Sequence, residues 1–159
     1  MICATARVGT RAFYEEFDSR EALLLEVATQ IVESAGQAAR AALADAPLTL
    51  QGTIAAGLST FLGFMTSDPR RAKVIYGAVP CAEPLTPDRH RAARGFVEML
   101  AAQAAALDIA PRAVGNNILA LALTGAIGEL LGFWVVAPSP PPIDDIVEEL
   151  THLFHGALS

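Results

Sequence analysis

Apolar residues recur at three- and four-residue intervals along most of the 159-residue chain, which is the spacing of amphipathic helices. We expect helices over residues 19–44, 49–66, from Pro69 onward, 87–107, 111–136 and 143–158, with a loop over 80–87. The last of these helices carries one apolar stripe, made of Ile143, Ile146, Val147, Leu150, Leu153, Phe154 and Ala157. No stretch alternates between apolar and polar residues as a half-buried strand does. The pattern therefore predicts an all-α fold.

Local signals mark where several of these helices begin. Phe13, Tyr14 and Phe17 share one side of a helical turn, and Asp18 or Ser19 then ends that helix and caps the next. Asp18 and Glu21 have the spacing of a capping box. Asp68 followed by Pro69 predicts another helix start, because proline fits the first helical position without losing a hydrogen bond. That helix is expected to turn Arg70, Arg71 and Lys73 outward and Val74, Ile75 and Tyr76 inward.

The order of residues near the start resembles the signature of the TetR family of transcriptional regulators. The matching residues are Val8 to Tyr14, then Phe17, Ser19 to Glu21, and Leu23-Leu24. Arg20 stands where the family usually has lysine, and Arg7 stands where it favours glycine for a turn. The resemblance implies a TetR-like helical regulatory domain with a remnant helix-turn-helix. Residues 1–18 would hold the recognition helix, and residues 19–159 the ligand-binding and dimerisation domain.

This resemblance implies a ligand-responsive transcriptional regulator that acts as a repressor. Thr10, Arg11 and Tyr14 would face bases and phosphates, and Arg20 would approach the DNA backbone. The alternative without a DNA-binding role is that Arg11 and Arg20 are ordinary solvated charges. Similar proteins carry two helices before the recognition helix, and Ile2 to Arg7 would supply only the tail of the second. About 30 residues of such a domain are therefore expected to be missing, so DNA binding is expected to be compromised in the chain as given. A free-standing dimeric small-molecule-binding helical module is the alternative function.

Aromatic, methionine and a few polar residues recur on the helices between residues 49 and 136. An apolar pocket for a small apolar or amphipathic effector is one interpretation, and a filled core is the other. The candidate ligand-binding residues are Phe61, Phe64, Met65, Tyr76, Phe96, Met99, Leu100, Gln103, Asn117 and Thr124.

The run from Ile118 to Ala137 is long enough to span a bilayer, but Glu129 in its middle argues against a membrane helix. Gly125, Gly128 and Gly132 would instead form a smooth surface that another helix approaches closely. We expect a homodimer through the last two helices, which also pair between subunits in the family that the chain resembles.

Composition narrows the function further. The net charge of −6 argues against indiscriminate nucleic-acid binding, which needs a basic face. Within residues 1–20, three arginines are offset by Glu15, Glu16 and Asp18. The two cysteines have no metal or disulfide spacing and no signal peptide is visible, so we expect a cytoplasmic protein. His152 and His155 suggest no third metal ligand, and no nucleophile has a catalytic context. We expect no metal, no cofactor and no enzymatic activity.

Overall fold

In the computed structural model, residues 2–47, 49–76 and 117–158 are described, together with the helical residues Gly95, Glu98, Ala102 and Ala105. The helices are α1 (Ile2–Ala6), α2 (Thr10–Glu16), α3 (Arg20–Ala44), α4 (Leu50–Ser67), α5 (Pro69–Tyr76), α7 (Asn117–Val136) and α8 (Ile143–Leu158). Every regular element in these ranges is helical, which confirms the all-α class. The predicted loop over 80–87 and the start of the apolar run before Asn117 lie outside the described residues. Of the helix predicted over 87–107, only Gly95, Glu98, Ala102 and Ala105 are described, and these four residues are helical.

Side-chain caps explain why α3 and α4 begin where they do. Ser19 Oγ accepts a hydrogen bond from the Ala22 amide at 3.0 Å, and Thr49 Oγ1 accepts one from the Gly52 amide at 3.1 Å. Each cap satisfies one of the free amides of the first turn. With Ser19 as the N-cap, Glu21 stands at the second helical position instead of the third. The predicted capping box between Asp18 and Glu21 is therefore wrong.

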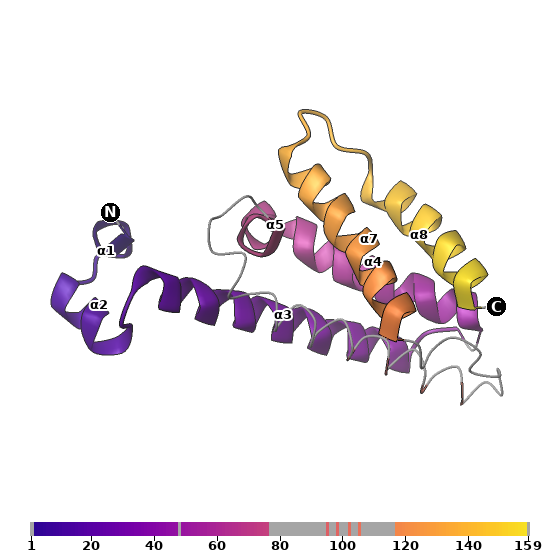
Figure 1. The fold of residues 1–159 in the computed structure, drawn as a ribbon, viewed down its shortest axis with the longest axis horizontal. Helices are drawn as coiled ribbons and strands as arrows, with labels where there is room; N and C mark the ends of the chain where they lie inside the picture. The colour runs from indigo at the N-terminus through magenta and orange to yellow at the C-terminus, as the bar shows by residue number, and fades with distance from the viewer. Residues whose placement is uncertain are drawn as a thin grey trace.

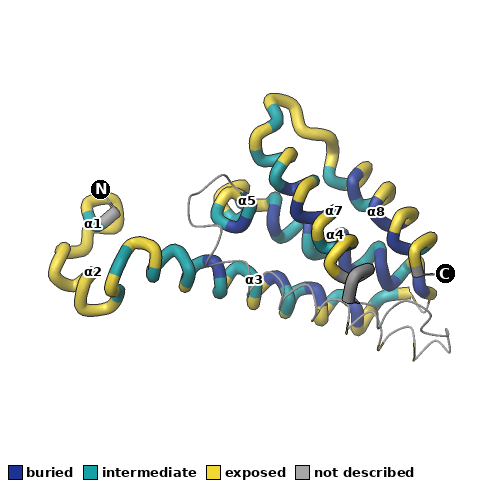
Figure 2. The backbone as a smooth tube through the Cα atoms, viewed as in Figure 1, coloured by how far each residue is buried: buried dark blue, intermediate teal, exposed yellow. Residues whose placement is uncertain are grey.

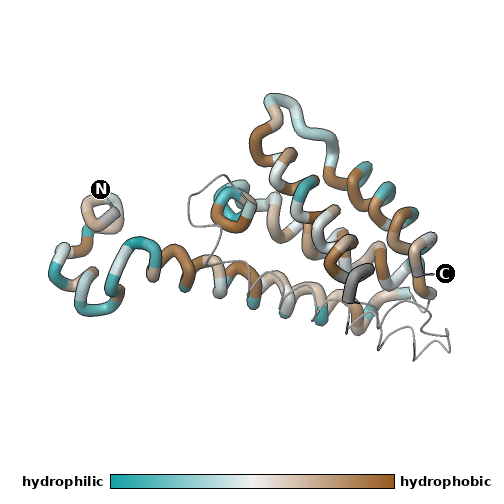
Figure 3. Tube along the Cα trace, in the orientation of Figure 1, coloured by the Kyte–Doolittle hydropathy of each residue, from teal (hydrophilic) through white to brown (hydrophobic). Residues whose placement is uncertain are grey.

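The main core lies where α4 meets its neighbours. α4 packs along α3 and α8 and contacts α5, and α5 packs on α7. Small buried side chains at Ala28, Ala35 and Ala39 let α3 approach α4 closely. Figures 2 and 3 show that buried and hydrophobic residues coincide along α4, α7 and α8. Among the described residues, the fully buried ones with the largest side chains are Phe154, Ile54, Leu58, Leu62, Met65 and Leu131.

The helices α1 and α2 lie at the N-terminal end of α3, away from this core (Figure 1). Phe13 is 8% exposed, and its ring packs edge-on against Tyr14 at 5.1 Å between centroids. The ring of Phe17 lies at a tilt to Phe13, 5.8 Å away. These three rings form a small aromatic cluster, although Tyr14 itself remains 60% exposed. The predicted domain division between residues 18 and 19 falls in the break between α2 and α3.

The last two described helices bury one face each. Leu123, Ile127 and Leu131 of α7 are in the core. On α8, Ile146, Leu150 and Phe154 are buried, but Leu153 and Ala157 of the predicted stripe are exposed because they lie at its edge and at the helix end. Among residues 2–47, 49–76 and 117–158, no helix has the length and hydropathy needed to cross a bilayer.

Candidate functional site

A tight turn connects α1 to α2, and the three elements together form a helix-turn-helix. The amide of Val8 donates to the Cys3 carbonyl at 2.9 Å, and the amide of Arg7 donates to the Ala4 carbonyl at 3.3 Å. Arg7 has a φ of 55°, so the end of α1 is a Schellman motif with a left-handed residue after the helix. Three residues, Arg7 to Gly9, separate the helices, which is the length of turn found in helix-turn-helix units.

One face of α2 is exposed to solvent. Thr10, Arg11 and Tyr14 are all exposed, whereas Phe13 faces the aromatic cluster. The structure therefore brings three of the four predicted DNA-binding residues together on one short helix. Arg20 is also exposed, but it belongs to the first turn of α3, across the break from α2.

The positive charge of Arg11 on this face is already paired with a carboxylate of the same helix. The Nε of Arg11 donates to Oε1 of Glu15 at 2.9 Å, and the two side chains are 93% and 60% exposed. An exposed pair of this kind contributes little stability. Its main consequence is that a carboxylate accompanies the arginine on α2 that is predicted to meet DNA.

The candidate ligand-binding residues divide into three groups. Met65 is 1% exposed and belongs to the core, as in the filled-core interpretation. Phe61, Phe64 and Tyr76 pack against that core but remain half-buried, and Thr124 on α7 is half-buried as well. The remaining predicted residues are Phe96, Met99, Leu100 and Gln103, which lie outside the described residues, and Asn117, which is the first residue of α7.

The corner between α4 and α5 holds an arginine that was predicted to point outward. Arg71 is half-buried: its Nη1 donates to the Phe64 carbonyl at 2.7 Å and to Ser67 Oγ at 2.9 Å. Its guanidinium carbon also lies 4.0 Å from the centroid of the Phe64 ring. The prediction of an outward side chain is wrong for Arg71 because the last carbonyls of α4 need hydrogen-bond donors. No local sequence pattern indicates this contact, since it spans seven residues across a helix break.

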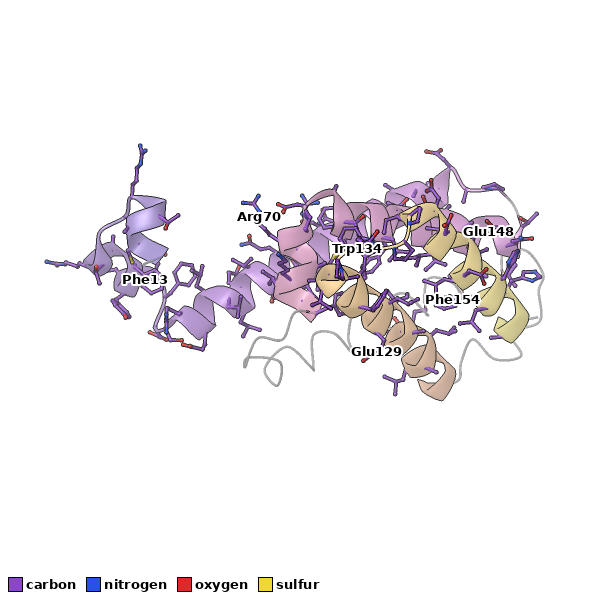
Figure 4. The ribbon with its side chains drawn as sticks, turned by 90° about the horizontal axis from the view of Figure 1, so that it is seen from above. Phe13, Arg70, Glu129, Trp134, Glu148 and Phe154 are labelled. Atoms are coloured by element: carbon purple, nitrogen blue, oxygen red, sulfur yellow. The ribbon has the colours of Figure 1, made fainter. Side chains whose placement is uncertain are left out.

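The neighbouring Arg70 does point outward (Figure 4). It forms a bidentate ion pair with Asp68, in which Nη2 donates to Oδ2 at 2.7 Å and Nε donates to Oδ1 at 2.9 Å. Hydrogen bonds from the Arg70 side chain and amide lower the pKa of Asp68 to about 2. The same pair raises the pKa of Arg70.

The outer face of α7 leaves large apolar side chains in solvent. Leu121 is 46% exposed, Phe133 57% and Val136 72%. Gly125 is exposed on this face, and a Cβ built there meets no atom of residues 2–47, 49–76 or 117–158 within 4 Å. Figure 4 shows Glu129 on the same helix, directed away from the core.

Gly128, in contrast, is buried within the subunit. The expectation that Gly128 belongs to the smooth outer surface with Gly125 is therefore wrong.

Other candidate chemistry does not assemble into a site in the part of the chain that the structure describes. No group of three or more histidine, cysteine, aspartate or glutamate side chains there is arranged to hold a metal ion. His152 is exposed on α8, and Cys3 is a free thiol that is partly exposed on α1.

No model of a known protein family matches the chain, and no curated protein matches it either. The resemblance to TetR regulators therefore depends on the residues between Val8 and Leu24, which form α2 and the start of α3.

Proposed function

We propose that the chain is a ligand-responsive transcriptional regulator of the TetR type, acting as a cytoplasmic repressor. The observation that carries the proposal is the helix-turn-helix at the tip of α3. Its second helix, α2, exposes Thr10, Arg11 and Tyr14 while Phe13 anchors it from behind. A helix held in this way is suited to enter the major groove of DNA.

The exposed groups on α2 have chemistry that fits DNA. Arginine recognises guanine edges or phosphates, and the hydroxyls of Thr10 and Tyr14 donate to phosphate oxygens. Arg20, in the first turn of α3, would contact the backbone beside the groove. These contacts would position α2, and the base edges would select the sequence.

The affinity for DNA is expected to be low. The arginines at 7, 11 and 20 are offset by Glu15, Glu16 and Asp18, and the whole chain has a net charge of −6. Because release of counterions from phosphates provides much of the affinity, this balance leaves little non-specific attraction. Binding of two copies to a pseudo-palindromic site would compensate for a weak single contact.

A second copy of the chain is the proposed partner for α7 and α8. A glycine inside a helix costs about 1 kcal/mol relative to alanine, yet no atom of the described residues occupies the space beside Gly125. Close approach of a helix from another subunit would explain the glycine. Such an approach would also cover the exposed side chains of Phe133 and Val136. A two-fold interface places the same surface on both subunits.

The proposed effector is a small apolar or amphipathic molecule that binds beside Phe61, Phe64 and Tyr76. These rings come from α4 and α5, which both contact α3. Since α2 is joined to the N-terminal end of α3, a shift of α3 would change the spacing between the two recognition helices, one α2 from each subunit of a dimer. The effector can move this equilibrium only by its difference in affinity for the two arrangements. No cofactor, metal or catalytic step is part of the proposal.

The experiment that tests this function is selection of duplexes from a random library by the immobilised chain at low salt. Because DNA binding by the chain as given is expected to be weak, we expect only modest enrichment of one motif, and loss of that enrichment in the Arg11→Ala variant. A neutral apolar dye, N-phenyl-1-naphthylamine, should bind the same preparation and report on the effector site through its fluorescence.

The charge balance around α2 also favours a second candidate, a dimeric small-molecule-binding module without DNA binding. The two functions give different results in the same experiment. Dye binding without any enriched motif would support the module and contradict the regulator.

A further inference from the structure

Arg71 holds one residue, Phe64, in two ways. Its guanidinium donates to the Phe64 carbonyl at 2.7 Å and lies over the Phe64 ring at 4.0 Å. Ser67 closes the arrangement, because its hydroxyl donates to the same carbonyl at 3.0 Å and accepts from Arg71 at 2.9 Å. The ring of Phe64 therefore serves both as a wall of the proposed effector site and as the support for a cation on α5.

The helix that carries Arg71 also carries Tyr76 of the proposed effector site and is in contact with α3. α5 contacts α3, α4 and α7. Ala72, next to Arg71, is 0% exposed, and Ile75 is 5% exposed. Both belong to one cluster with Leu25 and Ala28 of α3. A close-packed contact of this kind transmits displacement, because there is no free volume to absorb it.

We propose that Arg71 is a positioning residue that couples occupancy of the effector site to α3. An apolar molecule packed against Phe64 turns its ring, and the guanidinium above that ring loses its support. α5 then shifts against α3 through Ala72 and Ile75. This inference rests on the proposed effector site, but it assigns the coupling to a residue outside the predicted binding set.

The favourable interaction of a cation with an aromatic face depends on the cation lying over the ring, so a turned ring weakens it. The hydrogen bonds to the Phe64 carbonyl and Ser67 do not depend on the orientation of the ring. Arg71 therefore has one contact that responds to the effector and two that keep α5 attached to α4.

The chain offers a matched control in the adjacent residue. Arg70 has the same charge and lies on the same helix, but its partner is Asp68 and its side chain is 87% exposed. The Arg71→Gln and Arg70→Gln variants change net charge equally, and only the first removes the cation over Phe64.

The test uses the full chain and N-phenyl-1-naphthylamine as the apolar probe. Fluorescence titration gives its dissociation constant, and hydrogen exchange of α3 amides is measured with and without saturating probe. We expect the probe to alter exchange in α3 of the unmodified chain. In Arg71→Gln this alteration should fall at least about twofold, while the dissociation constant changes less than about threefold. Arg71→Lys, which keeps a cation, should restore part of the alteration, and Arg70→Gln should match the unmodified chain.

If the probe alters hydrogen exchange in α3 of Arg71→Gln as much as in the unmodified chain, the proposed coupling is overturned and the effector site is not. Failure of the probe to bind the unmodified chain would overturn the effector site itself. If Arg71→Gln does not fold, Phe64→Leu provides the second variant, since it removes the ring and keeps the carbonyl. Transmission in Phe64→Leu equal to that of the unmodified chain would also overturn the proposal.

Discussion

Replacing Arg7 by glycine should stabilise the turn between α1 and α2. Arg7 is exposed and has a φ of 55°, a conformation in which the Cβ of an L-residue crowds the backbone. That crowding costs about 1–2 kcal/mol, and glycine avoids it. Glycine also gains more freedom in the unfolded chain, which offsets about 0.4–1 kcal/mol of the benefit. The net stabilisation of the helix-turn-helix is therefore about 0.5–1 kcal/mol.

Hydrogen exchange measures this local stability directly, because the Val8 amide donates to the Cys3 carbonyl across the turn. A gain of about 0.5–1 kcal/mol should slow exchange at Val8 and in α2 by about two- to fivefold. Arg7→Ala is the control: it removes the same charge but keeps the crowded conformation, so it should give no slowing. Arg7→Asn should fall between the two, because asparagine tolerates this region.

Equal slowing in Arg7→Gly and Arg7→Ala would refute the reasoning, since charge and not backbone conformation would then explain the effect. Faster exchange in Arg7→Gly would show that the turn does not hold the left-handed residue.

Three further outcomes are expected. Phe154 is fully buried, whereas Leu153 is 54% exposed. Urea denaturation should therefore show a free energy of unfolding lower by about 3–5 kcal/mol in Phe154→Ala and by at most about 0.5 kcal/mol in Leu153→Ala. Equal losses in the two variants would contradict the packing of α8. The pKa of Asp68 is depressed to about 2 from 3.8, so the stability it contributes is present above pH 3.8 and is lost as the pH falls towards 2. Arg70→Gln should raise the Asp68 titration midpoint measured by NMR, and an unchanged midpoint would exclude the ion pair. Gly125→Arg should convert a homodimer into monomers in sedimentation equilibrium, whereas an unmodified chain that is monomeric at micromolar concentration would refute the interface.

The helix starts could be predicted because their causes are local. Ser19 and Thr49 each hydrogen bond to an amide three residues ahead, and Asp68 accepts from the amide of Arg70 two residues ahead. Such contacts depend on a few consecutive residues, so they are visible in the sequence.

The orientation of α7 could not be predicted in this way. Its sequence is apolar on nearly every side, so the spacing does not distinguish Gly128, which is buried, from Phe133, which is exposed. Only packing against α5 and the rest of the core selects the inner face. The amphipathic α8 shows the contrast, because its buried apolar residues, Ile146, Leu150 and Phe154, are among those that the pattern marked.

In the candidate sites as well, features set by neighbouring residues could be predicted from the sequence, whereas features set by the packing of helices could not. The exposure of Thr10 and Arg11 follows from the position of Phe13 on a short helix, and the sequence was sufficient for it. The placement of Tyr14 was predicted only in part, since its ring touches Phe13 but stays 60% exposed. The contact of Arg71 with Phe64 depends on the angle between two helices, which no spacing rule describes.

The central claim is that α2 is the element that meets DNA, and matched charge variants test it most directly. Glu15→Gln with Glu16→Gln removes two carboxylates from α2 and frees Arg11 from its ion pair. Glu148→Gln with Glu149→Gln changes the net charge by the same amount on the exposed side of α8. Fluorescence anisotropy on labelled duplexes at low salt gives the affinity of each double variant.

The account predicts that the α2 variant binds about tenfold more tightly than the unmodified chain, with a steeper dependence on salt, because Arg11 becomes available to phosphates. The α8 variant should change affinity less than about twofold, since its charges lie far from the contact. Equal gains in the two variants, or no gain in the α2 variant, would contradict the claim that α2 reads DNA.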